Sequence, residues 1–203
     1  MSLPYNKTNI ITNALIYLGY PKFQSIAAAG PAGEAIDAIY DSVKYADLSS
    51  PNWRFATKVV QLSQLAGVNP GFEWYNSAYQ IPPDCLAVWQ IYPTLPYEIY
   101  GEQIWTANGP NQPLKMQYRH WPVPESMLPP AYLQYLSYLI AHEVGPGLIK
   151  DSNLLKDIES RMTNWRAKAM CVNTQGRPNE GLINSSWVNS RPAGSFYGTM
   201  WNT

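Results

Sequence analysis

The sequence predicts an α+β fold: a bundle of about four helices with an inserted antiparallel β domain and an extended C-terminal arm. Three observations lead to this prediction. Apolar residues recur at helical spacing in residues 1–52 and again in 123–175, and they alternate with polar residues through 53–122. Neither period continues through 176–203. Residues 1–52 are thus the predicted first half of the bundle and 123–175 its second half. Residues 53–122 are the β domain inserted between them, and 176–203 are the arm.

The first predicted helix covers residues 8–19. Asn6 or Thr8 can cap its N-terminus, because a short polar side chain accepts hydrogen bonds from the first free N–H groups of a helix. Gly19 is expected to end the helix, since glycine readily takes the left-handed conformation that closes helices.

The second predicted helix covers about 32–49 and ends before Pro51. Its apolar residues share one face, at i, i+3, i+4 and i+7: Ile36, Ile39, Tyr40 and Val43. Trp53 follows the end of this helix. We expect its side chain to be largely buried where the bundle meets the β domain.

The β domain begins with residues 55–66, whose β-branched side chains indicate a strand or a short irregular piece. Alternating strands follow, over 87–92, 97–105 and 114–121, and a turn at 108–111 separates the last two. Three structural residues are expected to form the hinge by which the chain enters the sheet: Pro82, Asp84 and Leu86.

The second half of the bundle contains two further predicted helices. Residues 130–144 are apolar on nearly every side, which indicates a central, mostly buried helix. Gly145-Pro146-Gly147 is expected to break it. A fourth helix covers about 152–172, and its predicted inner face holds Leu155, Ile158, Met162, Trp165 and Ala169.

The arm is rich in Gly, Asn, Ser and Pro, as linkers are, but it also carries large aromatic side chains that could bind a partner. Its only charged residues are Arg177, Glu180 and Arg191, whereas a disordered tail is usually rich in charge and poor in aromatic residues. We therefore predict that the arm orders against another subunit through five partner-binding residues: Trp187, Arg191, Phe196, Tyr197 and Trp201. A flexible tail with incidental aromatic residues is the alternative.

Composition favours a subunit of an assembly. Charged residues make up 14% of the chain, against about 25% in a typical soluble domain, and there are 15 Tyr and 8 Trp. Tyr and Trp are favoured at protein contacts, where Lys, Glu and Asp are depleted. A monomer with a neutral surface is the alternative. The net charge of zero gives no electrostatic basis for tight nucleic-acid binding, and neither a signal peptide nor a membrane span is expected.

No residue is predicted to be catalytic, to bind a metal or to bind a cofactor. His142 opens a sequence like a zinc-protease helix, but position 146, where the second ligand is needed, is Pro146. His120 lies at a strand end and is expected to be exposed. Asp37 and Asp41 lie on one outward helix face, where solvated carboxylates are the default. Phosphate-binding and nucleophile-elbow motifs are missing from the sequence.

The order of elements resembles the tail tubular protein A and head-to-tail adaptor family of short-tailed bacteriophages. The resemblance covers roughly residues 8–175 and lies in a few positions: Trp53, Phe55, Tyr79, Pro82, Asp84, Leu86, Gly101 and Tyr118. It implies a structural virion protein of the neck, which forms a homo-oligomeric, twelve-membered ring between the portal protein and the tail nozzle protein. Duplex DNA would pass through the lumen without sequence specificity, and no membrane would be involved.

Two other functions stay open at this point. One is a tail-associated carbohydrate- or receptor-binding module, which would need exposed, coplanar Trp and Tyr rings on one sheet face. The other is a cell-wall-degrading enzyme, because a peptidoglycan-cleaving activity has been ascribed to some tail proteins of this kind.

Overall fold

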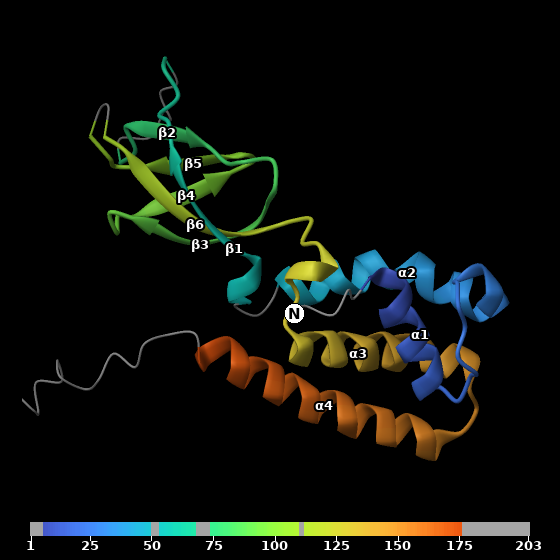
Figure 1. Cartoon of the computed structure of the whole chain (residues 1–203). Helices are drawn as coiled ribbons and strands as arrows, with labels where there is room; N and C mark the ends of the chain where they lie inside the picture. The colour runs from blue at the N-terminus through green and yellow to red at the C-terminus, as the bar shows by residue number, and fades with distance from the viewer. Residues whose placement is uncertain (1–5, 50–52, 68–73, 110–111, 176–203) are drawn as a thin grey trace, which may run out of the picture. The chain divides into compact units, whose positions relative to one another are not determined.

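The computed structural model describes residues 6–49, 53–67, 74–109 and 112–175. The described residues up to Asn173 belong to one compact unit. Figure 1 labels the helices and strands. The helices are α1 (Lys7–Tyr17), α2 (Gly30–Ser49), α3 (Pro130–Leu148) and α4 (Ser152–Gln175), with 3₁₀ turns at Ala27–Ala29, Arg54–Ala56 and Glu125–Met127. The strands are β1 (Thr57–Leu62), β2 (Ser77–Gln80), β3 (Cys85–Tyr92), β4 (Tyr97–Tyr100), β5 (Gln103–Thr106) and β6 (Leu114–His120).

Helix α1 begins one residue before and ends two residues before the predicted bounds of 8 and 19. The Asn6 side chain accepts a hydrogen bond from the Asn9 N–H at 2.9 Å, so Asn6 is the N-cap and Thr8 is not. Gly19 takes a positive φ of 86° just after the helix, a conformation that glycine adopts without steric cost. The inner face is apolar and contains Ile10, Ile11, Ala14 and Leu15.

Helix α3 is central to the helical core, as predicted, but it does not end at Gly145. It continues through Pro146 to Leu148. Pro146 is tolerated because it lies in the last turn, where a missing N–H removes one hydrogen bond without interrupting a long helix. Gly145 is buried, and a Cβ there would lie 2.6 Å from Leu155 Cδ2. Glycine at this position therefore allows close approach of α4.

The prediction of a four-helix bundle with an inserted antiparallel β domain is wrong, although the structure is α+β. The strands form two separate three-stranded antiparallel sheets. The four helices also differ in how much of each is buried in the helical core. In α4 only Ile158 and Ala169 are buried, while Met162 and Trp165 of its predicted inner face are partly buried. The arm at 176–203 lies outside the described residues.

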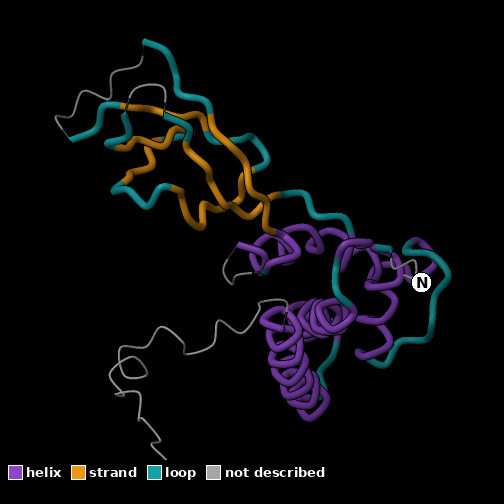
Figure 2. Tube along the Cα trace, turned by 60° about the vertical axis from the view of Figure 1, so that its left-hand side comes forward, coloured by secondary structure: helices purple, strands orange, loops and turns teal. Residues whose placement is uncertain are grey.

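The six strands lie together (orange in Figure 2) and form sheets of order β1-β6-β3 and β2-β5-β4. In the first sheet β6 is central: Thr57 of β1 pairs with Arg119, and Cys85 of β3 pairs with His120. Register shifts between Cys85 and Ala87 and between Val88 and Gln90 mark irregularities in β3. The two sheets share one apolar cluster, composed of Leu62, Tyr79, Ile91, Ile104, Leu114, Met116 and Tyr118.

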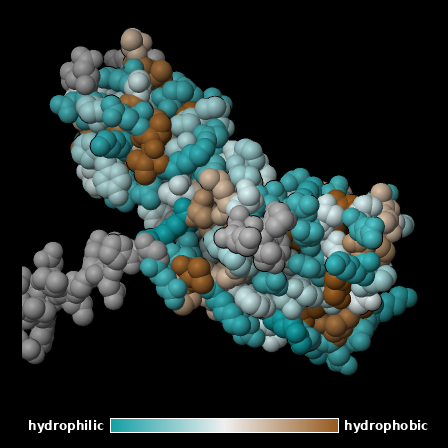
Figure 3. Space-filling model, in the orientation of Figure 1, coloured by the Kyte–Doolittle hydropathy of each residue, from teal (hydrophilic) through white to brown (hydrophobic). Residues whose placement is uncertain are grey.

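Hydrophobic residues also reach the surface. On the face shown in Figure 3, brown patches interrupt the polar surface of both the strand region and the helices. The exposed large side chains of the strand region are Val59, Trp74, Trp89, Tyr92, Ile99 and Tyr100. Among the described residues, none of the helices combines the length and apolar character needed to cross a membrane.

Candidate functional site

A pocket of about 600 Å³ lies beside strand β4, and it is called the β4 pocket below. It is lined by Trp74, Tyr75, Pro96, Glu98, Tyr100 and Ala107. Glu98 and Tyr100 are two residues apart on one strand, so their side chains leave the same face of the sheet. On this face their cross-strand partners in β5 are Trp105 and Gln103. Side chains on this face of β4 and side chains from the segment before β2 together form the pocket wall.

The β4 pocket holds one carboxylate, on Glu98, between two phenol groups. The Tyr100 hydroxyl donates a hydrogen bond to Glu98 Oε2. That bond to the carboxylate raises the pKa of Tyr100. Desolvation, together with a hydrogen bond to Glu98, raises the pKa of Tyr75. The Tyr100 hydroxyl thus orients the Glu98 carboxylate.

Aromatic rings supply most of the remaining wall. Trp74 is 78% exposed, which is unusual for so large an apolar side chain. The Tyr100 and Trp105 rings lie 4.5 Å apart between centroids, with planes tilted by 38°. The site is thus an aromatic concavity with one negative charge and not a flat ring platform.

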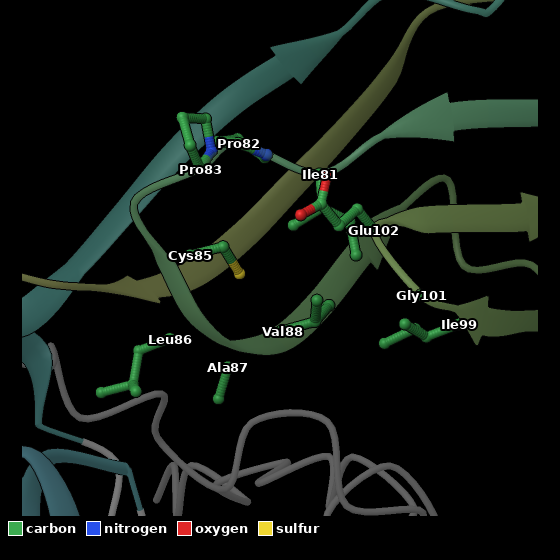
Figure 4. A pocket seen from close by; sticks show the side chains of 10 residues that line it. All are labelled: Ile81, Pro82, Pro83, Cys85, Leu86, Ala87, Val88, Ile99, Gly101 and Glu102. Carbon is green, nitrogen blue, oxygen red and sulfur yellow. The ribbon is translucent and has the colours of Figure 1, made fainter.

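A second pocket, of about 290 Å³, contains two of the predicted hinge residues, Pro82 and Leu86 (Figure 4). Cys85 and Glu102 also line it. Burial raises the pKa of the Cys85 thiol to about 11. Because the thiolate is the reactive form of cysteine, this thiol is unreactive at neutral pH.

Asp84, the third predicted hinge residue, connects strands of the first sheet. Its carboxylate lies 2.8 Å from Lys58 Nζ of β1 and accepts a hydrogen bond from the Tyr118 hydroxyl of β6 at 3.0 Å. Its backbone oxygen accepts from the Trp121 N–H at 2.8 Å. The Lys58 hydrogen bond lowers the pKa of Asp84. Asp84 thus fixes the start of β3 against both β1 and β6.

Trp53 is fully buried, as the sequence predicts. Its ring packs edge-on against Tyr132 of α3, with 4.8 Å between centroids, and lies near Phe55. Its buried Nε1 has no hydrogen bond of normal geometry. Among the groups that lower the pKa of Asp47, the Trp53 side chain makes the smallest contribution.

Asp47 lies in a third pocket, of about 490 Å³, with Glu143 and Arg166. Its two carboxylate oxygens accept hydrogen bonds from the Tyr132 and Tyr135 hydroxyls, at 2.9 and 2.8 Å. Burial raises the pKa of Asp47, and it outweighs the two tyrosine hydrogen bonds and the charge of Arg166. This carboxylate therefore links α2 to α3 from a partly desolvated position.

The two histidines differ in their surroundings. The expectation that His120 is exposed is wrong: it is buried, and its Nδ1 lies 2.9 Å from the Ala56 carbonyl oxygen. His120 shares the buried face of β6 with Tyr118, two residues before it. His142 is partly exposed, and its Nδ1 lies 3.7 Å from Glu143 Oε1. No cluster of three or more His, Cys, Asp or Glu suited to a metal ion occurs in the described ranges.

The five predicted partner-binding residues of the arm, Trp187, Arg191, Phe196, Tyr197 and Trp201, lie outside the described residues. The structure instead reveals a candidate site that the sequence analysis missed, formed by Trp74, Tyr75, Glu98 and Tyr100. A signal for it was present. Tyr97-Glu98-Ile99-Tyr100 places an acid and an aromatic residue on one face of a short strand, and a Trp-Tyr pair lies just before β2.

Neither a protein-family model nor a curated protein matches this chain.

Proposed function

We propose that this chain is a structural subunit of a bacteriophage neck. Copies of it assemble into a ring that joins the portal protein to the tail nozzle, and duplex DNA passes through the lumen without sequence recognition. The observation that carries the proposal is the exposed aromatic surface at the outer strands of both sheets. The proposal also draws on the resemblance of the element order to head-to-tail adaptors.

The outer strands β3 and β4 have the character of contact surfaces. Each hydrogen-bonds to one neighbour within its own sheet, β6 and β5 respectively. An outer strand presents unpaired backbone groups, and monomeric proteins usually protect it with charged residues. Strand β3 contains no charged residue, and its Trp89 and Tyr92 are exposed. Such a strand suits coverage by another subunit.

Two partly buried carboxylates have roles that suit a structural protein. Asp84 joins three strand segments, and Asp47 joins two helices through tyrosine hydroxyls. The Asp84 carboxylate connects strands of one sheet, and the Asp47 carboxylate fixes the position of α2 against α3. Zero net charge also suits a DNA conduit, because a strongly basic wall would retain the phosphate backbone.

The test is assembly with the portal. The full-length chain is mixed with a purified portal ring, and the complex is measured by native mass spectrometry. We expect a ring of twelve copies. Trp89→Lys with Tyr92→Lys should prevent ring formation, whereas Val172→Lys, an exposed apolar residue of α4, is the matched control and should not. Rings formed equally well by all variants would remove β3 from the interface, and a chain that never joins the portal would contradict the proposal.

A cell-wall hydrolase is a second candidate, and one observation favours it. Asp47 has a raised pKa and shares a pocket with Glu143, and a general acid needs a raised pKa. Lysis of purified peptidoglycan decides between the two functions. The structural proposal predicts no lysis, and lysis that is lost in Asp47→Asn would select the hydrolase.

A further inference from the structure

We propose that the β4 pocket is a docking site for the Arg191-Pro192 segment of a second copy of this chain. This inference rests on the proposed function, since it names a contact that links neighbouring subunits of the ring. The C-terminal residues 176–203 supply the ligand, and the β4 pocket of the next subunit receives it.

The chemistry of the β4 pocket selects a cation with flat, weakly hydrated faces. Glu98 is the one charged residue among those that line it, and the walls are Trp74, Tyr75, Tyr100 and Pro96. A guanidinium group pairs with a carboxylate and also stacks on aromatic faces. Because the Tyr100 hydroxyl orients the Glu98 carboxylate, the negative charge is in place before a ligand arrives.

A sugar fits this pocket less well. A saccharide brings many hydroxyl groups, and each one that is buried without a partner costs binding free energy. The side chains lining the pocket offer one carboxylate, two hydroxyls and the Trp74 indole N–H, and the Tyr100 hydroxyl is already directed at the carboxylate. The 38° tilt between Tyr100 and Trp105 also departs from the coplanar arrangement that a stacking platform for sugar rings needs.

The chain itself contains a ligand of matching chemistry. Residues 176–203 carry two arginines, and both precede proline, in Arg177-Pro178 and Arg191-Pro192. A residue before proline favours an extended backbone, which suits docking beside the open edge of β4. Arg191 is the better candidate because Trp187 and Phe196 lie within five residues of it and can add apolar contacts.

Contact with a second copy accounts for ring formation. The arm and the β4 pocket are different surfaces, so their pairing between copies is head-to-tail, the type of contact that closes into rings. The 15 residues between Gln175 and Arg191 can span up to roughly 50 Å, at about 3.3 Å each. A reach of this size is sufficient to bridge neighbouring subunits of ordinary size.

The test uses a synthetic peptide of residues 186–197 and the full-length chain carrying Arg191→Ala, so that its own arm lacks the charged group and does not compete through it. Isothermal titration measures binding. We expect saturable binding that weakens at least tenfold when Glu98→Arg is added, and a peptide with Arg191→Glu should bind this double variant better than the unmodified peptide does. Glu159→Arg, an exposed acid on α4, is the matched control and should leave binding unchanged.

Each other outcome overturns the inference. Peptide binding that is unaffected by Glu98→Arg would place the arm elsewhere, and binding of a cell-wall oligosaccharide in preference to the peptide would make the pocket a sugar site. Cross-linking of the arm to the β4 pocket of its own chain, in mixtures of isotopically light and heavy protein, would also overturn it. If the peptide fails to bind but the chain still joins the portal as a ring, this inference falls and the proposed function stands.

Discussion

The Lys44 ammonium group lies 2.8 Å from Glu125 Oε1, and the Lys44 side chain is only 3% exposed. Lys44 also donates a hydrogen bond to the Val123 carbonyl oxygen at 2.6 Å. The Tyr40 hydroxyl donates to the same Glu125 oxygen at 3.1 Å. This buried ion pair joins α2 to the segment that precedes α3, a connection across about 80 residues of sequence.

Lys44→Met should destabilise the protein by about 3 kcal/mol, because it leaves a partly buried carboxylate without its charged partner. Urea unfolding followed by tryptophan fluorescence measures the change. Lys7→Met is the control, since the Lys7 pairs with Asp37 and Asp41 are more exposed and should be worth at most about 1 kcal/mol. If the two substitutions lowered the free energy of unfolding equally, burial of the Lys44–Glu125 pair would not explain its contribution.

Acid should remove the contribution of Glu125 to the stability of the fold. Burial acts to raise its pKa, but the Lys44 hydrogen bond and charge prevail, so the folded-state pKa lies below the ordinary value of 4.5. The ion pair therefore contributes stability that is fully present above pH 4.5 and is lost as the pH falls through the folded-state pKa. The stability difference between wild type and Glu125→Gln should shrink over that range. A difference independent of pH would contradict this assignment.

The contribution of Asp47 to stability should depend on pH in the opposite sense. Its folded-state pKa is raised above the ordinary value of 3.8 by burial, so its favourable contribution is present below pH 3.8 and lost as the pH rises through the folded-state pKa. Asp47→Asn should thus be at least as stable as wild type at neutral pH and lose this advantage in acid. Thermal melting at several pH values checks the sign, and a variant destabilised more at neutral pH than in acid would refute it.

Trp53→Ala should cost about 3–5 kcal/mol, as truncation of a fully buried aromatic residue does. The loss comes from the cavity left beside Tyr132 and Phe55. Trp89→Ala is the control and should cost much less, because Trp89 is 41% exposed in the isolated subunit. Chemical denaturation of the two variants measures the difference.

Truncation after Gln175 should leave the fold intact and abolish docking to the portal. Residues 1–173 form a compact unit, so melting should be nearly unchanged. Circular dichroism during heating and a portal pull-down measure the two properties. If the truncated chain unfolds, the arm belongs to the core of its own subunit, and equal portal binding would make it dispensable.

Local sequence patterns predicted individual elements better than their arrangement. The alternation of Leu114 through Tyr118 identified β6, and the Gly19 stop placed the end of α1. The division into two sheets depends on pairings such as Thr57 with Arg119, more than 60 residues apart, which alternation does not reveal. Helix α3 continues through Pro146 because this proline lies in the last turn and because α4 packs closely against Gly145. Neither fact can be seen in the local sequence.

The candidate site was harder to predict for a related reason. Trp74 and Tyr75 follow a loop and Glu98 and Tyr100 lie on a strand, so they become neighbours only after β2, β4 and β5 have paired. His120 illustrates the same point, since its partner, the Ala56 carbonyl, lies 64 residues away. Chemical character was readable in sequence, but proximity was not.

The number of copies bound to an isolated portal ring decides whether this chain is a ring-forming subunit of the neck. Native mass spectrometry of the full-length chain saturating a purified portal gives this number. We expect twelve copies in one closed ring, with loss of the ring when β3 carries Trp89→Lys and Tyr92→Lys. A portal that binds a single copy or none would contradict it.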